Sequence, residues 1–188
     1  MCIRDRTITD PISLEQTNTA NGFSDGLITL NSVIDSYDDL IAIDAIETAQ
    51  VTMANAVVQV TDEVDLSKIN ELRADTTGDI TVDEVKETKE NLTAINEFVA
   101  EQGVAGDVIL SNSDITVTDV VNKSEADTIN AYSDQGGTVF LTSISDIFEN
   151  VTDLQNNQAI DINNSEITIS DVISLYDCLL YTSDAADE

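Results

Sequence analysis

The chain has 188 residues, of which 37 are acidic and seven are basic, so its formal net charge is −30, and it contains no histidine. This acidity excludes ordinary nucleic-acid binding, which needs Lys and Arg for phosphate contacts, and the lack of histidine excludes Ser-His-Asp triads and histidine-based zinc sites. Carboxylates spread over the whole chain are typical of a solvated face, so we expect no enzyme.

The only two cysteines, Cys2 and Cys178, lie in the end segments. Residues 178–183, Cys-Leu-Leu-Tyr-Thr-Ser, and the opening Met-Cys-Ile-Arg-Asp correspond to the two strands of one transposon sequencing adapter, each translated in one frame. We therefore expect residues 1–6 and 178–188 to be adapter-derived scars and residues 7–177 to be a piece of a longer protein. On this interpretation the two cysteines form neither a disulfide nor a metal clip.

A first motif occurs four times along residues 8–171 and ends in Ile/Val-Thr/Ser-Asp. The final aspartates are Asp10, Asp62, Asp119 and Asp171, which are 52, 57 and 52 residues apart. The copies QVTMANAVVQVTD, DVILSNSDITVTD and AIDINNSEITISD align without gaps. Each copy places an asparagine (Asn55, Asn112 or Asn164) between two alternating apolar segments, which predicts two short strands joined by a tight corner.

A second motif lies between the copies of the first. Its copies GLITLNSVID, GDITVDEVKE and GTVFLTSISD begin at Gly26, Gly78 and Gly137 and end at Asp35, Glu87 and Asp146. The alternation of apolar and polar residues again predicts strands.

Apolar residues follow helical spacing after the acidic ends of both motifs. The predicted helix faces are Leu66, Ile69 and Leu72, then Leu92, Ile95 and Val99, then Phe148, Val151 and Leu154. We expect a long helical segment over residues 84–102, and Gly78 and Gly137 as helix stops.

The two motifs together predict an α/β fold, a β/α solenoid of about 52-residue double repeats, with parallel strands in one layer and helices in the other. The expected units are residues 10–61, 62–118 and 119–170, with a partial unit at 171–177. A row of small β-rich domains is the alternative, and the long Lys/Glu-rich helical segment argues against it.

The acids that end the motifs are the candidate site residues: Asp10, Asp35, Asp62, Asp119, Asp146 and Asp171. The favoured interpretation is that each is the N-cap of the helix that follows it, worth ~1 kcal/mol. The alternative is a calcium site, because carboxylates stacked in successive coils repel one another and Ca²⁺ takes six to eight oxygen ligands. No other cofactor is expected.

The segments VTDEVDLSKINELRADTTGDI and ITVTDVVNKSEADTINAYSDQGGTV resemble the repeats of very long, acidic, cysteine-free surface or secreted adhesin-like proteins of marine bacteria, cyanobacteria included. The matching positions are Val60, Thr61, Asp62, Leu66, Ile69, Asn70, Thr77, Gly78 and Ile80, and then Val117, Thr118, Asp119, Ile129, Asn130, Gly137, Thr138 and Val139. This chain departs from the pattern in its greater acidity and in Lys123, which replaces a helix leucine.

The resemblance implies an extracellular or cell-surface spacer, adhesin-like or S-layer-like, whose partners are neighbouring repeats of the same longer chain. The expected function is a non-catalytic structural stalk, with bracing by calcium as an open question. The alternative is a repeat module that binds a polysaccharide or a cell surface. No apolar run is long enough to span a membrane, so no membrane span is expected in this fragment.

Overall fold

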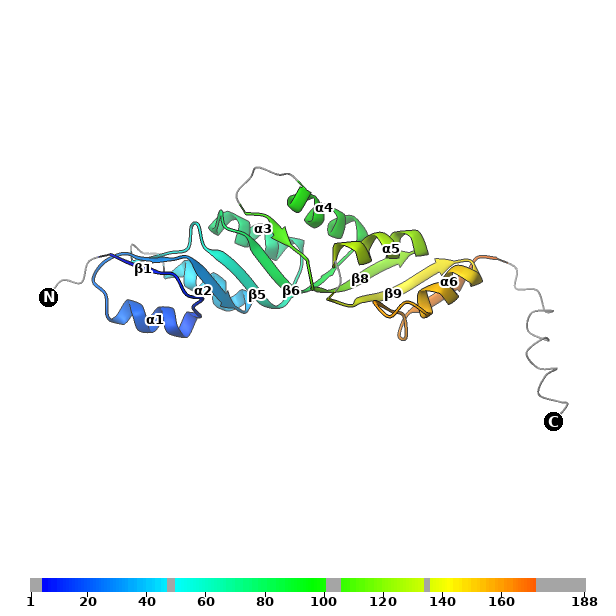
Figure 1. Ribbon diagram of the computed structural model, residues 1–188, viewed down its shortest axis with the longest axis horizontal. Helices are drawn as coiled ribbons and strands as arrows, with labels where there is room; N and C mark the ends of the chain where they lie inside the picture. Colours follow the sequence, from blue (N-terminus) through cyan, green and yellow to red (C-terminus); the bar gives the residue numbers. More distant parts are fainter. Residues whose placement is uncertain (1–4, 47–49, 101–105, 134–135, 172–188) are drawn as a thin grey trace, which may run out of the picture.

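The computed structural model describes residues 5–46, 50–100, 106–133 and 136–171. These residues form an elongated α/β molecule with eleven strands and six helices (Figure 1). In chain order the elements are β1 (Arg6–Ile8), α1 (Leu14–Gly22), β2 (Ile28–Leu30), β3 (Ser32–Asp35), α2 (Tyr37–Ala45), β4 (Val51–Thr52), β5 (Val57–Val64), α3 (Leu66–Asp75), β6 (Ile80–Glu87), α4 (Lys89–Ala100), β7 (Val108–Ile109), β8 (Asp114–Val121), α5 (Lys123–Tyr132), β9 (Val139–Asp146), α6 (Phe148–Gln155), β10 (Ile160–Asp161) and β11 (Glu166–Ile169).

The strands lie along the molecule nearly in the order in which the chain makes them. The larger sheet has the order β10-β9-β8-β6-β5-β3, with β11 also paired to β9 and β7 to β6, and a smaller sheet has the order β1-β2-β4. Each of these pairs is parallel. The predicted α/β class with parallel strands is therefore confirmed.

The register of the larger sheet explains why alternate strands space their buried residues differently. Val58 and Val60 of β5 lie opposite Ile80 and Val82 of β6, but the register then shifts between Val60 and Glu63. A bulge of this kind adds one residue to one strand and bends it. The same shift separates the pairs of β8 and β9. Strands β5 and β8 therefore carry one more residue between their last two buried positions than β6 and β9 do.

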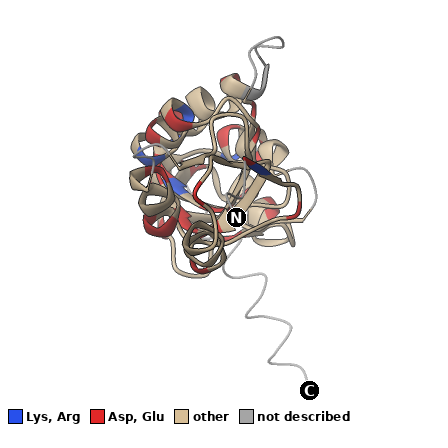
Figure 2. Ribbon diagram, turned by 90° about the vertical axis from the view of Figure 1, so that its left-hand side faces the viewer, with Lys and Arg blue, Asp and Glu red and all other residues tan. Residues whose placement is uncertain are grey.

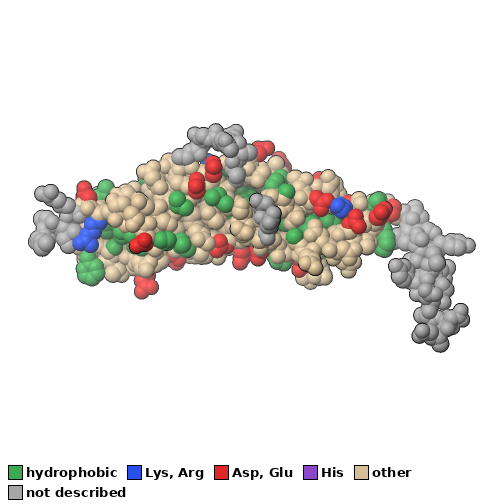
Figure 3. All heavy atoms as spheres, in the orientation of Figure 1, with side chains coloured by type: hydrophobic (Ala, Val, Ile, Leu, Met, Phe, Trp, Pro, Cys, Tyr) green, Lys and Arg blue, Asp and Glu red, His purple; other side chains and the backbone are tan. Residues whose placement is uncertain are grey.

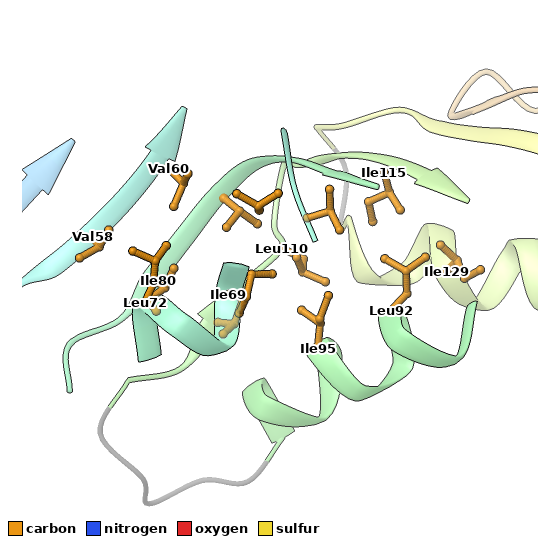
Figure 4. Packing of buried hydrophobic residues seen from close by; sticks show 14 of the residues in the cluster. Val58, Val60, Ile69, Leu72, Ile80, Leu92, Ile95, Leu110, Ile115 and Ile129 are labelled. Atoms are coloured by element: carbon orange, nitrogen blue, oxygen red, sulfur yellow. The ribbon is translucent and has the colours of Figure 1, made fainter. Parts of the chain in front are cut away.

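The helices form a second layer, and each helix contacts the next one from α1 to α6. In Figure 1, α3 and α4 lie above the strands, whereas α1 and α6 lie below them. Helices α2 to α6 each present two buried residues at i, i+3 spacing, such as Ile69 and Leu72 on α3 and Leu92 and Ile95 on α4. These side chains point toward the strands (Figure 4), and each stabilises the fold by ~1.5–3 kcal/mol. Val99, the third residue of the predicted α4 face, lies outside the described side chains.

Two predicted features differ from the structure. Residues 84–87 belong to β6 rather than to a helix, because Glu84 and its neighbours pair with β8, and α4 begins only at Lys89. Gly78 and Gly137 follow the ends of α3 and α5, but the C-cap residues are Thr76 and Ser133. The two glycines are required because a Cβ would lie 2.0 Å from the carbonyl oxygen of Ala56 at Gly78, and 1.8 Å from that of Ser113 at Gly137.

The predicted asparagine corners are present between short and long strands. Asn55, Asn112 and Asn164 each occupy the turn that precedes β5, β8 or β11. Asn112 has φ 69°, a left-handed conformation that asparagine tolerates better than most residues do.

Candidate functional site

Six carboxylates form the most regular polar feature of the molecule, and we call them the carboxylate row. Each lies at or near the carboxyl end of a strand and accepts a hydrogen bond from the first backbone N–H of the helix that precedes that strand in the chain. The bonds are Leu14 N to Asp35 Oδ2 at 2.8 Å, Tyr37 N to Asp62 Oδ1 at 2.7 Å, Leu66 N to Glu87 Oε1 at 3.0 Å, Lys89 N to Asp119 Oδ1 at 2.9 Å, Lys123 N to Asp146 Oδ2 at 2.8 Å and Phe148 N to Asp171 Oδ1 at 2.9 Å.

The chemistry of a helix N-terminus explains these bonds. The first N–H groups of an α-helix have no partner within the helix, and the helix dipole favours a negative charge there. A carboxylate that accepts such an N–H makes a charge-assisted hydrogen bond, which is stronger than a neutral one. Each member of the row therefore ties the start of one helix to the end of the next strand.

The acids of the row bond helix N-termini, as predicted, but each bonds the helix that precedes its strand and not the helix that follows it. The cap of α2 is Ser36, which directly follows Asp35, and the cap of α3 is Asp65, three residues after Asp62. The N-termini of α2 and α3 are thus each bonded twice, once by their own N-cap residue and once by a carboxylate from the next strand–helix pair, whereas the N-cap of α6, Ile147, makes no side-chain bond.

The sequence contained evidence for the true caps. Ser13 and Gln16 form a capping box at the start of α1, and Asn122 and Glu125 form another at the start of α5. In both cases the spacing is that of an N-cap residue followed three positions later by Glu or Gln. The row also includes Glu87, which ends a copy of the second motif but was not among the six candidate aspartates.

Asp146, like Glu87, accepts three hydrogen bonds. Its Oδ2 accepts Lys123 N–H, while Oδ1 accepts the backbone N–H of Ile147 at 2.8 Å and the side-chain amide of Asn150 at 2.9 Å. The hydrogen bond from Lys123 is the main cause that lowers the pKa of Asp146 below its ordinary value, and it outweighs the opposing effect of burial. Asp146 is therefore held in its charged form.

Asp10 is the candidate aspartate that does not join the row. It is exposed, and within the part of the chain that the structure describes its carboxylate accepts no hydrogen bond. It nevertheless occupies the same motif position as Asp62 and Asp119, and it differs from them in that no described helix precedes it.

Within residues 5–46, 50–100, 106–133 and 136–171, no three acidic side chains come together in a group that could hold a metal ion. The members of the row are separated by one strand–helix pair each, and their oxygens accept N–H groups. The Oδ1 atom of Asn55, at the corner before β5, accepts the hydroxyl of Thr77 at 2.8 Å.

The acidic residues lie around the whole circumference of the molecule (Figure 2), whereas several of the few basic residues join neighbouring helices. Lys89 on α4 pairs with Glu125 on α5 at 2.8 Å. The guanidinium of Arg73 on α3 lies 4.6 Å from the ring centre of Phe98 on α4. The hydrogen bond from Lys89 is the first cause that lowers the pKa of Glu125.

The pair α2–α3 is joined by a tyrosine. The Tyr37 hydroxyl donates to Glu71 Oε2 at 2.5 Å, and this bond, with burial as a second cause, raises the pKa of Tyr37 to about 12. Lys68 lies over the same ring, 5.0 Å from its centre. Each of these exposed contacts is weak alone, but together they follow the helix layer from α2 to α5.

No family model, no curated protein and no solved structure matches this chain. Among the described residues, no helix combines the length and the apolar character that crossing a bilayer requires.

Proposed function

We propose that residues 7–177 are a stretch of β/α solenoid built from 52-residue double repeats, and that it acts as a non-catalytic acidic spacer in a bacterial cell-surface or secreted protein. The observation that carries the proposal is the carboxylate row. The same bond recurs at the N-terminus of each of the six described helices, so each strand–helix pair is joined in the same way to the part of the chain that follows it. A structure whose units contact only their neighbours can be lengthened without changing any unit.

The two motifs give the double repeat its two alternating halves. In the second motif, Asp35, Glu87 and Asp146 also accept the backbone N–H of the residue that follows them. In the first motif, the N-cap lies three residues after the acid, as with Asp62 and Asp65. These two arrangements alternate along the chain and support a unit of two strand–helix pairs.

The charge of the molecule supports a spacer role. A net charge of −30 favours solubility and repels other acidic surfaces. Because like charges on a long molecule oppose compaction, acidity and a neighbour-to-neighbour fold act in the same direction, toward an extended rod.

Duplication of one unit tests the proposed architecture. A chain in which residues 62–118 occur twice in succession should fold cooperatively, and small-angle X-ray scattering should show a longer molecule with an unchanged cross-section. The control carries a scrambled copy of the same residues at the same place. Equal scattering profiles for the two variants would contradict the solenoid.

Recovery of the parent reading frame tests the proposed role. We expect long-read sequencing of the source DNA to show further units of about 52 residues behind a secretion signal. A frame in which these residues flank a histidine- or cysteine-bearing catalytic domain, without further units, would contradict the spacer.

A further inference from the structure

One exposed aromatic residue departs from the pattern of the second motif, and core packing does not account for it. Phe140 occupies the place that Thr29 and Thr81 hold in the other copies of the second motif. Its neighbours Val139 and Leu141 are buried, so its ring lies on the solvent side of β9, where 37% of the residue is exposed. Because this side chain points away from the core, replacing threonine with phenylalanine here does not improve core packing.

The ring borders an open depression between the start of β9, the end of α6 and β10. The depression has a volume of about 490 Å³, within the ~300–1,000 Å³ of small-molecule sites. Four of its eight lining residues are Gln155, Asn157, Gln158 and Asn163, and one, Asp161, is acidic. Phe140 is in register with Asp161 on β10.

We propose that this depression binds a unit of a neutral polysaccharide. An aromatic face carries partial negative charge and attracts the C–H groups of a pyranose ring, and each side-chain amide offers both N–H donors and a carbonyl acceptor for sugar hydroxyls. Asn157 is held in place, since its Oδ1 accepts the backbone N–H of Ala159 at 3.0 Å.

Charge selects the class of saccharide. The chain has a net charge of −30, so an anionic polysaccharide is repelled over distances of about a Debye length, ~8 Å at physiological salt. The other exposed apolar side chains are scattered over the face seen in Figure 3 rather than gathered into one large patch, which favours a ligand that needs a single ring contact over a protein partner. This inference is independent of the spacer proposal.

Native affinity electrophoresis tests the site with the complete 188-residue chain. The gels contain hydroxyethyl cellulose, laminarin, dextran or galactomannan as neutral probes, or alginate as the anionic probe. We expect at least one neutral polysaccharide to retard the chain and alginate to have no effect. Retardation by none of the four neutral polymers, or by alginate alone, would overturn the proposal.

Two variants of Phe140 test whether its ring contacts the polysaccharide. Phe140→Thr restores the residue of the other copies, so it should melt like the parent chain while the Kd for the retarding polymer rises at least about tenfold, as for removal of an aromatic hot spot. Phe140→Trp should retain binding. Phe23→Thr, which removes another exposed phenylalanine (69% exposed), is the matched control and should bind like the parent chain.

Unchanged binding by Phe140→Thr, or equal loss in Phe23→Thr, would overturn the proposal. If Phe140→Thr alters the melting curve, Gln158→Ala decides instead, because this exposed side chain lies outside every helix and strand. A rise in Kd of about threefold or more supports the site, and an unchanged Kd rejects it.

Discussion

The Oδ2 atom of Asp146 accepts the backbone N–H of Lys123 at 2.8 Å, although the two residues belong to different strand–helix pairs. Lys123 begins α5, and Asp146 ends β9, the strand that follows α5 in the chain. The N-terminus of each helix that the carboxylate row bonds therefore depends on the strand–helix pair that follows it. Such coupling between neighbours is the property that allows repeat proteins to unfold from their ends or as a unit.

Removal of the Asp146 carboxylate should destabilise the fold. Asp146→Ala removes the bond to Lys123 and leaves Ile147 N–H without its acceptor, so we expect the free energy of unfolding to fall by about 1–2 kcal/mol. The measurement is urea unfolding followed by circular dichroism. Asp10→Ala is the matched control, since it removes a motif-ending aspartate that lies outside the row and should change stability by less than about 0.5 kcal/mol. Equal losses in the two variants would show that charge alone, and not the row, is responsible.

The same pair predicts a pH dependence. Because the pKa of Asp146 is lower in the folded chain than its ordinary value of 3.8, the ionised carboxylate stabilises the folded state. That contribution is fully present above pH ~4 and is lost as the pH falls through the folded-state pKa. The difference in stability between the parent chain and Asp146→Ala should therefore be constant from pH 7 to 5 and shrink below pH 4. A difference that grows on acidification would contradict the assignment.

Glycine substitutions test the close contacts between neighbouring strands. In Gly137→Ala the new Cβ would lie 1.8 Å from the carbonyl oxygen of Ser113, and we expect a loss of about 1–3 kcal/mol from overpacking. Gly22→Ala is the control, because nothing lies within 4 Å of its added Cβ. That variant should gain about 0.4–1 kcal/mol by restricting the unfolded chain. Thermal melts of the two proteins should move in opposite directions, and a shift of both in the same direction would refute the packing argument.

The parts of the fold that were predicted from sequence are those that depend on local apolar periodicity. Leu66, Ile69 and Leu72 recur at helical spacing, and the structure places them on α3, with Ile69 and Leu72 fully buried. Strand alternation likewise identified Ile80 and Val82 of β6. These patterns need no knowledge of neighbouring units, since each helix or strand has one buried face.

The parts that were missed depend on contacts between one strand–helix pair and the next. Asp62 was assigned to the helix that follows it, but it bonds Tyr37, which lies 25 residues earlier. The strand character of Glu84 comes from its pairing with Asp114 on β8, whereas its local composition favoured a helix. No single-segment pattern encodes either relationship, because both arise only when the pairs stack.

The response to cations tests whether charge screening alone supports this acidic fold. With a net charge of −30, the folded chain is strained by self-repulsion, so added salt should raise the melting temperature. Calcium and magnesium chloride at equal concentration should raise it equally, since no group of three acids among the described residues is placed to hold a metal ion. An ordered calcium site would distinguish the two ions, because Ca²⁺ accepts six to eight oxygens at 2.3–2.6 Å while Mg²⁺ demands near-ideal octahedral geometry. A melting temperature higher in calcium than in magnesium, and lowered again by a calcium-selective chelator, would therefore establish a calcium brace and contradict screening alone.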